Sequence, residues 1–236
     1  MSKKKAICAL IAMSMISAVQ AQYAGWQQAG SIYILTTPEG ANLPATASEE
    51  NFPLLVRLNK ETFDFKQAKA GGEDIRFSAA GQPLAYQVEA WDAAAGEASI
   101  WVRIPLIKGN ARQEIKMHWG KADASSESSG KAVFNASNGF VTVLHMGDPV
   151  QDEVGSVEPN DKGTTPSLGM IGRGRRFDPG KGINCGEKLT MLPTGSNPHS
   201  TGVWIKSEKS NVTPMAWSQH SLVFFVKAFR ILVDNF

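Results

Sequence analysis

The feature that most constrains the fold is a series of short segments of strand-like composition, several with alternating apolar and polar residues. They cover residues 31–36, 52–58, 73–77, 86–91, 99–104 and 115–120, with Gly, Pro or Asn between them. Recurring strands of this length, separated by chain breakers, are typical of β-sandwiches. Because no segment keeps the 3.6-residue apolar period of an amphipathic helix, the sequence predicts an all-β protein with few helices.

Residues 1–21 have the composition of an export signal. Three lysines at 3–5 precede an apolar run at 6–19, and Val19-Gln20-Ala21 places small residues where a signal peptidase cleaves. The run is shorter than the ~20 residues that span a bilayer as a helix. We therefore expect cleavage after Ala21, a periplasmic or extracellular protein, and no transmembrane segment in the mature chain. An uncleaved membrane anchor is the alternative.

Charge and cysteine usage fit an exported protein. Cleavage changes the formal net charge from +2 to −1, because residues 1–21 hold three lysines and no acid. A nearly neutral chain has no overall field to attract nucleic acid, so we expect no nucleic-acid partner. Of the two cysteines, Cys8 leaves with the signal and Cys185 is alone, which excludes an internal disulfide. Cys185 is expected to be a buried small apolar residue and not a nucleophile.

Four motifs follow one another in a fixed order over residues 26–123. They are Asp74-Ile75-Arg76-Phe77, Tyr86-x-x-Glu89-x-Trp91, a Trp101-Val102 strand and a closing Trp119-Gly120. In this order they resemble the bacterial domain-of-unknown-function family two-three-four-one. The resemblance implies an exported β-rich module, here residues 22–123. Members of that family are often followed by a concanavalin A-like domain of the LamG type, and some precede a proton-channel segment resembling MotA, TolQ and ExbB.

The second half of the chain is similar to the beginning of such a LamG-type domain. The segment AVFNASNGFVTVLHM resembles its first strand, IGRGRRFDPGKGINCG its entry hairpin, and HSTGVWIKSE a strand that carries Trp and Lys. A jelly roll of this kind needs ~150 residues or more, and 107 remain from Gly130 onward. We therefore expect a linker at 124–131 and, at 132–236, a truncated or frame-shifted partial jelly roll with an atypical apolar C-terminal tail.

The stretch GMIGRGRRFDPGKG, residues 169–182, holds five glycines and four basic residues. A dinucleotide or phosphate loop would need a helix directly after the glycines, and Phe177-Asp178-Pro179 occupies that place. A nucleic-acid patch would need a basic domain and stacking aromatics. The stretch is better explained by glycine turns that lead into a strand with solvent-facing arginines.

No residue pattern indicates catalysis, so we expect a protein that is not an enzyme. Retaining glycoside hydrolysis needs two carboxyl groups ~5–5.5 Å apart, and the adjacent Asp152 and Glu153 would point to opposite faces of a strand. No Gly-x-Ser-x-Gly elbow accompanies the histidines, and none of them has zinc-ligand spacing. His145 lies in an apolar run, where a satisfied core imidazole is the expected state. A glycoside hydrolase-like enzyme remains an alternative.

Two sets of residues are candidates for binding. Trp26 and Trp91 lie near strand ends, where an exposed aromatic face could stack on a sugar ring. Asp148, Asp152, Glu153 and Asp161 offer oxygen ligands for calcium, and a solvated acidic loop is the other explanation. No other cofactor is expected.

Together these observations predict an exported, non-catalytic module that binds a glycan or a protein at the cell envelope. The alternative from another class is the ectodomain fragment of a MotA/TolQ/ExbB-like transport component.

Overall fold

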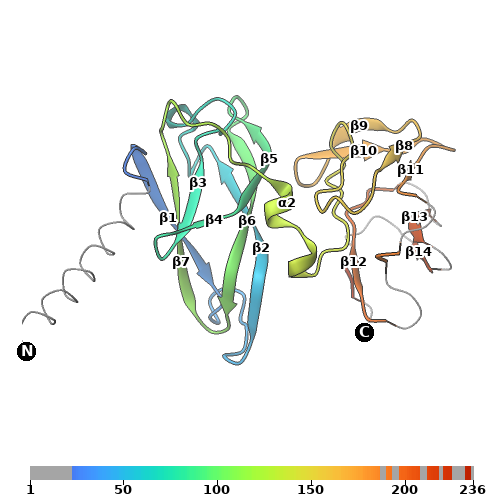
Figure 1. Ribbon diagram of the computed structural model, residues 1–236, viewed down its shortest axis with the longest axis horizontal. Coiled ribbons are helices and arrows are strands. Elements are labelled where there is room, and N and C mark those ends of the chain that lie inside the picture. The colour runs from blue at the N-terminus through green and yellow to red at the C-terminus, as the bar shows by residue number, and fades with distance from the viewer. Residues whose placement is uncertain are drawn as a thin grey trace, which may run out of the picture. The chain divides into compact units, whose positions relative to one another are not determined.

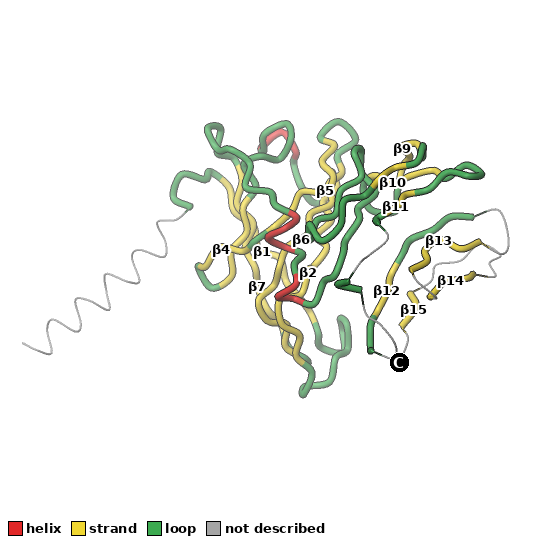
Figure 2. Tube along the Cα trace, turned by 45° about the vertical axis from the view of Figure 1, so that its right-hand side comes forward, coloured by secondary structure: helices red, strands yellow, loops and turns green. Residues whose placement is uncertain are grey.

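A computed structural model of the chain describes residues 23–186, 190–192, 197–207, 212–217, 220–224 and 232–234. Almost all regular elements are antiparallel strands, which confirms the predicted all-β class (Figure 2). The chain divides into two compact units, Met1–Glu187 and Lys188–Phe236. The predicted signal at 1–21 lies outside the described residues, as does most of the predicted apolar tail. None of the helices in the described ranges has the length and apolar character needed to cross a membrane.

The first unit contains a β-sandwich of two antiparallel sheets (Figure 1). The first sheet has the order β1-β7-β3-β4, formed by Gln28–Leu35, Arg112–Trp119, Arg76–Ala79 and Gln82–Leu84. The second has the order β2-β6-β5, formed by Ser48–Asn59, Glu97–Lys108 and Tyr86–Asp92. A short 3-10 helix, η1 (Phe65–Gln67), lies in the connection between β2 and β3.

The core between the sheets follows from the alternation seen in the sequence. In β6, Ala98, Ile100, Val102 and Ile104 are buried, and every second residue points the other way. Apolar side chains of β1, β3 and β7 complete the core, among them Phe77 and Ile115. Removing such side chains from water supplies most of the favourable free energy of folding. The outer face of β6, with Trp101 and Arg103, is left for other partners.

Those partners come from the segment that follows β7. The predicted linker at 124–131 runs along the sandwich: the backbone N–H of Ser129 donates to the carbonyl of Tyr86 at 2.9 Å, and that of Val88 to Ser128 Oγ at 2.8 Å. Helix α2 (Gly130–Val133), capped by the Ser129 side chain, then packs against β5 and β6. The segment is thus fixed to the second sheet, while a domain boundary there stays a prediction.

The rest of the first unit consists of a 3-10 turn, loops and two short ladders. The turn is η2 (Ala136–Asn138). One ladder pairs β8 (Asn160–Asp161) with β11 (Ile183–Asn184), and the other pairs β9 (Thr165–Leu168) with β10 (Arg173–Arg176). In the second unit β12 (Ser200–Gly202) pairs with β15 (Leu232–Asp234), and β13 (Val212–Trp217) with β14 (His220–Phe224). The partial jelly roll stays a prediction.

Candidate functional site

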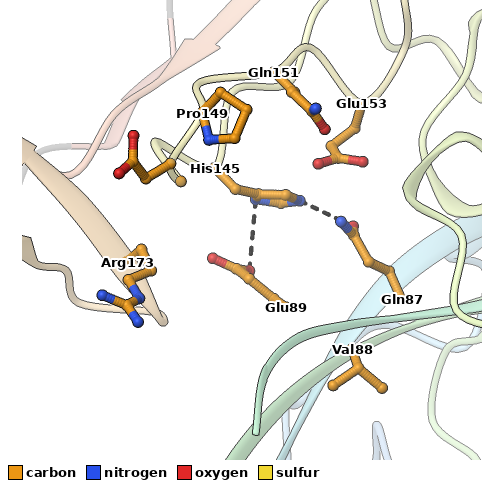
Figure 3. Close-up of a pocket in the computed structure, with 10 residues that line it drawn as sticks. Gln87, Val88, Glu89, His145, Pro149, Gln151, Glu153 and Arg173 are labelled. Atoms are coloured by element: carbon orange, nitrogen blue, oxygen red, sulfur yellow. Dashed lines mark hydrogen bonds and ion pairs between the residues drawn. The ribbon is translucent and has the colours of Figure 1, made fainter. Parts of the chain in front are cut away.

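A cleft of about 450 Å³ lies where β5 meets residues 145–153 and the start of β10. Its principal polar residues are Gln87, Glu89, His145, Gln151, Glu153 and Arg173 (Figure 3). Ligand sites in proteins are concave and orient the ligand through a small number of placed polar groups. We therefore take it as the candidate site.

Two of these side chains, Gln87 and Glu89, lie on the outer face of β5 at a β-bulge. Val88 pairs with Ile100 and Ala90 with Ser99, so Glu89 is the extra residue between two ladder positions. Such bulges redirect side chains next to functional sites. Gln87, which pairs with Trp101, shares the outer face with it, and the bulged Glu89 reaches the same indole.

Glu89 and His145 form the centre of the cleft. The side chain of Glu89 is 6% exposed, and its Oε2 accepts a hydrogen bond from Trp101 Nε1. The same oxygen lies 3.5 Å from His145 Nδ1, and His145 Nε2 lies 3.0 Å from Gln87 Oε1. Both ring nitrogens of His145 therefore face a partner (Figure 3).

Burial decides the protonation of this pair. It raises the pKa of Glu89 to about 7 against the opposing effect of the Trp101 hydrogen bond, and it lowers the pKa of His145 to about 4. Between these two values both groups are neutral, since desolvation penalises each charged form. His145 Nε2–H can then donate to Gln87 Oε1, while Nδ1 stays 3.5 Å from Glu89 Oε2.

The hydrogen bonding continues from Gln87 to Glu153. Burial raises the pKa of Glu153, and the Gln87 side-chain hydrogen bond lowers it to a smaller extent. This arrangement depends on Gly130, because a Cβ there would lie 1.7 Å from Glu153 Oε2 and 2.9 Å from Gln87 Nε2. We call the five linked side chains, Trp101, Glu89, His145, Gln87 and Glu153, the cleft network.

Aromatic rings close the cleft network on its inner side. The imidazole of His145 stacks on Trp101, with centroids 6.1 Å apart and planes at 16°. Phe134 meets both rings edge-on, at 5.3 Å from His145 and 5.5 Å from Trp101. The imidazole is packed as expected from its apolar run, but it also lines the cleft.

Asp152 shapes the loop that carries His145 and Glu153. Its carboxylate accepts four backbone N–H groups at 2.8, 3.1, 2.7 and 3.1 Å, from Val143, Val154, Ser156 and Val157. Ionised acceptors form stronger hydrogen bonds than neutral ones, so one side chain organises residues 143–157.

The structure does not bring the four predicted calcium ligands into one cluster. Asp161 accepts from the Thr164 backbone and hydroxyl and from Arg175, which also binds Asp148 at 3.1 Å. Asp152 caps its loop, and Glu153 belongs to the cleft network. Throughout the described part of the chain, no three His, Cys, Asp or Glu side chains are grouped so as to hold a metal ion.

Neither predicted tryptophan lines the cleft. The β5 bulge shifts the alternation, so Trp91 pairs with the buried Ala98 and its ring packs edge-on against Phe63 and Phe65. The ring also fills the space beside Gly72, where a Cβ would lie 2.6 Å from Trp91 Cε3. Trp91 is therefore partly buried against the core.

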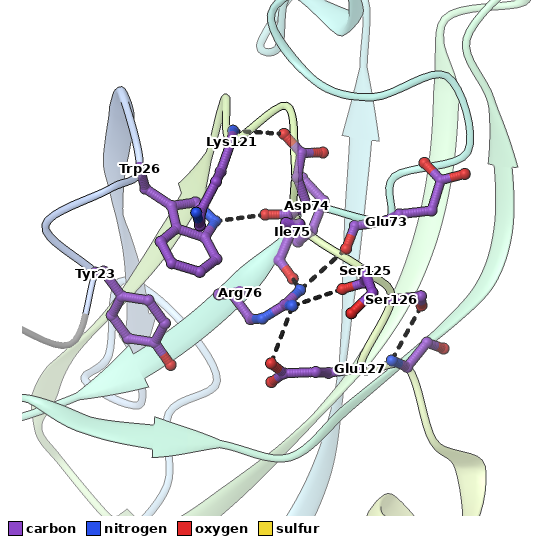
Figure 4. A network of polar contacts seen from close by, with 12 residues as sticks. Tyr23, Trp26, Glu73, Asp74, Ile75, Arg76, Lys121, Ser125, Ser126 and Glu127 are labelled. Carbon is purple, nitrogen blue, oxygen red and sulfur yellow. Dashed lines mark hydrogen bonds and ion pairs between the residues drawn. The ribbon is translucent and has the colours of Figure 1, made fainter.

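Trp26 belongs to a different groove, of about 420 Å³, which it lines together with Tyr23, Ser78 and His118. Its indole N–H donates to the Asp74 carbonyl at 2.7 Å. The charged groups of Arg76 and Lys121 each lie 5.4 Å from its ring centroid (Figure 4). The half-exposed indole thus lies near two protein cations, and its stacking on a sugar ring stays a prediction.

The Asp74-Ile75-Arg76-Phe77 motif has a structural explanation. The Asp74 side chain accepts from the backbone N–H of Lys69, Gly120 and Lys121 at 2.7 to 3.1 Å. The buried Arg76 donates to Tyr86 Oη at 2.9 Å and to the Ser125 carbonyl at 2.7 Å, and pairs with Glu127 at 3.0 Å (Figure 4). The motif therefore ties β3 to β5 and to the segment after β7.

The glycine-rich stretch supplies the turn of the β9–β10 hairpin and strand β10. Arg173 and Arg176 are exposed as predicted, but the prediction is wrong for Arg175, whose side chain is only 4% exposed because it binds Asp148 and Asp161.

Gly172 has a φ of +63°, in agreement with the predicted turn, and its Cβ position lies 3.3 Å from Glu89 Oε1. Arg57 donates to the carbonyl of Met170 at 3.2 Å, and Arg173 lines the cleft. The hairpin therefore forms one wall of the candidate site.

Sequence reasoning missed the residues at the centre of the site. Glu89 stands in the Tyr-x-x-Glu-x-Trp motif, which served only to mark a resemblance, and His145 was expected to be a core residue. Gln87 carried no signal of its own. The pairing of Glu89 with His145 across 56 positions could be found only once β5 and the following loop were placed together.

The family model for a domain of unknown function, DUF2341, matches residues 71–145. This range includes Gln87, Glu89 and Trp101 and ends at His145, while Glu153 and Arg173 lie beyond it. The match supports the first part of the resemblance described above. No curated protein and no solved structure matches the chain.

Proposed function

We propose that the protein is exported and serves as a non-catalytic binding module of the cell envelope, with a glycan as the ligand of the cleft. The observation that carries the proposal is the set of planar polar groups at the cleft. Gln151 and Arg173 are exposed, and Glu153, a member of the cleft network, is partly exposed.

These groups suit a ligand rich in hydroxyls. A sugar hydroxyl both donates and accepts, and amide, carboxylate and guanidinium groups supply complementary acceptors and donors. Glu153 is held from behind by Gln87, which reduces the side-chain entropy lost on binding. A protein partner would favour a broader and more apolar surface than this cleft.

Isothermal titration calorimetry of the full chain, with oligosaccharides selected on a glycan array, tests the proposal. We expect Glu153→Gln and Gln151→Ala each to weaken binding about tenfold, the cost of a lost hydrogen bond at a charged or well-placed group. Glu61→Gln, at an exposed loop position remote in sequence from the cleft, is the matched control. The proposal is refuted if the protein is retained on no glycan of the array, or if both cleft variants bind the selected glycan with unchanged affinity.

One observation favours a second candidate, a glycoside hydrolase. Glu89, with a pKa of about 7, and Glu153 line the same cleft, and a protonated carboxyl beside a second carboxylate is the arrangement that glycosidic cleavage uses. Release of reducing ends from a bound glycan, abolished in Glu89→Gln, would support this candidate. Binding without turnover in the unmodified protein would exclude it for that glycan.

A further inference from the structure

A serine and a histidine meet in the second groove, the one lined by Tyr23 and Trp26. Ser78 Oγ lies 3.0 Å from His118 Nε2, and both side chains line this groove of about 420 Å³. A hydroxyl within hydrogen-bond reach of an imidazole nitrogen is the arrangement that activates serine nucleophiles. We call Ser78 and His118 the groove dyad.

The strand register explains how the groove dyad forms. In the pairing of β3 with β7, Ser78 stands opposite Lys116, two positions before His118. Ser78 and His118 are therefore diagonal neighbours on the outer face of the first sheet, within reach of a long or aromatic side chain. The Tyr23 ring stacks on the imidazole, with centroids 4.4 Å apart and planes at 22°. The histidine is thus held in place on a sheet.

The imidazole has the protonation state of a general base. Burial lowers the pKa of His118, and the charge of Lys116 lowers it further, so the ring is neutral at pH 7. In the tautomer that carries its proton on Nδ1, Nε2 accepts the Ser78 hydroxyl. Ser78 is 4% exposed, so a substrate meets its hydroxyl inside the groove.

Lys116 places a positive charge beside the groove dyad. It lines the same groove, and its effect on the pKa of His118 means that the ammonium lies close enough to act on the dyad. None of the ion pairs between described residues includes it. A cation near a nucleophile can stabilise the oxyanion that forms when a carbonyl is attacked. The groove thus holds a nucleophile, a base and an electrostatic stabiliser.

We propose that Ser78 is a nucleophile activated by His118, and that the groove takes short-chain carboxylic esters as substrates. Ser78 Oγ bonds to the ester carbonyl carbon while its proton passes to His118 Nε2. The bond from the carbonyl carbon to the alkoxy oxygen then breaks, and the leaving alcohol takes that proton. Water repeats both steps on the acyl-serine, which releases the carboxylic acid and restores the serine.

The lining of the groove indicates this substrate class. Tyr23 and Trp26 form an aromatic wall beside the groove dyad, and such a wall suits a short apolar acyl chain. The site is separate from the cleft, so the proposal does not depend on the ligand assigned there, and the non-catalytic role proposed above concerns the cleft alone.

Labelling of the full chain with a fluorophosphonate, an electrophile that reacts with activated serines, tests the proposal. We expect a single covalent adduct by intact-mass spectrometry, mapped to Ser78 by peptide analysis. Ser78→Ala should lose the adduct, and His118→Gln should slow labelling by about 100-fold or more, the usual contribution of a general base. Both variants should also lose the hydrolysis of p-nitrophenyl acetate that we expect of the unmodified chain.

The matched control is Ser31→Ala. Ser31 lies on the other side of Lys116 in the register of the same sheet, and its hydroxyl donates to Glu114. This variant should be labelled at the rate of the unmodified chain. Circular dichroism melts of all variants separate lost reactivity from lost folding. The proposal is overturned if the unmodified chain gains no adduct, if the adduct lies on another residue, or if folded His118→Gln reacts as fast as the unmodified chain.

Discussion

The carboxyl Oε2 of Glu89 lies 3.5 Å from Nδ1 of His145, and this contact joins a bulge in β5 to the loop organised by Asp152. The pair is buried, and its two pKa values are shifted in opposite directions. That opposition gives the pair a testable effect on stability.

The two members should have opposite effects on the pH dependence of unfolding. The folded pKa of Glu89, about 7, exceeds the ordinary value of 4.5, so its contribution is present at low pH and is lost as pH rises through 7. The folded pKa of His145, about 4, is below 6.5, so its contribution is present above 6.5 and is lost as pH falls through 4. In the unmodified protein the two slopes largely cancel between pH 4.5 and 6.5.

Single variants should remove this cancellation. Relative to the unmodified protein, Glu89→Gln should gain stability with rising pH between 4.5 and 6.5, and His145→Gln should lose it over the same window. Each slope is at most about 1.4 kcal/mol per pH unit, the value for one proton. Urea unfolding at pH 4.5, 5.5 and 6.5 measures the slopes. Parallel pH profiles for the three proteins would contradict the assigned pKa directions.

Gly130→Ala should disturb the cleft network directly. The new Cβ would meet Glu153 Oε2 at 1.7 Å, and the displaced carboxylate would lose its hydrogen bond to Gln87. Overpacking of this kind costs about 1–3 kcal/mol of unfolding free energy, measurable by urea titration. Gly182→Ala is the control, because no atom lies within 4 Å of its Cβ position. Equal stability of the two variants would show that Glu153 does not pack on Gly130.

Arg76→Met should destabilise the sandwich more than any surface arginine variant. It removes the donors to Tyr86 and Ser125 and leaves their acceptors buried or partly buried. A buried acceptor left without its donor costs about 1–3 kcal/mol. Thermal melting would show the difference from Arg112→Met, whose guanidinium lies over the exposed Tyr33 ring at 3.8 Å. Similar melting temperatures would mean that the Arg76 contacts contribute little.

Calcium should not stabilise the first unit. Asp152, Asp161 and Asp148 already accept from backbone or arginine donors, and Glu153 from Gln87. A ligand that binds only the folded state raises the melting temperature, so scanning calorimetry with 1–5 mM calcium (on the order used to saturate extracellular sites) should match the scan in a chelator. A calcium-dependent rise of several degrees in the melting temperature would instead support the calcium site expected from the sequence.

The strands of the sandwich could be predicted because their signal is local. Alternation in β6 marks Ile100 and Val102 as core residues without knowledge of any other strand. The position of Trp91 could not be predicted in the same way, because a single extra residue at Glu89 reverses the alternation after it. Simple counting along β5 puts Trp91 on the same face as Glu89, whereas the bulge turns its ring toward Phe63 and Phe65. Bulges depend on cross-strand pairing, which one strand's composition does not reveal.

The predicted calcium ligands, at residues 148–161, are a second case in which the sequence alone was not sufficient. Its composition indicated hard oxygen ligands, and the carboxylates are present as expected, but backbone N–H groups and Arg175 occupy them. Which donors reach a carboxylate is determined by the path of the loop. That path depends on contacts between residues far apart in the sequence.

The hydrogen bonds of residues 124–129 to β3 and β5 bear on where this chain can be cut into independently stable pieces. A fragment ending at residue 123 would deprive the buried Arg76 of Ser125 and Glu127, and Val88 of Ser128. Ending at Val157 instead would retain the loop that Asp152 organises, and with it His145 and Glu153. Limited proteolysis should therefore spare the connection after β7, although its composition is that of a flexible spacer.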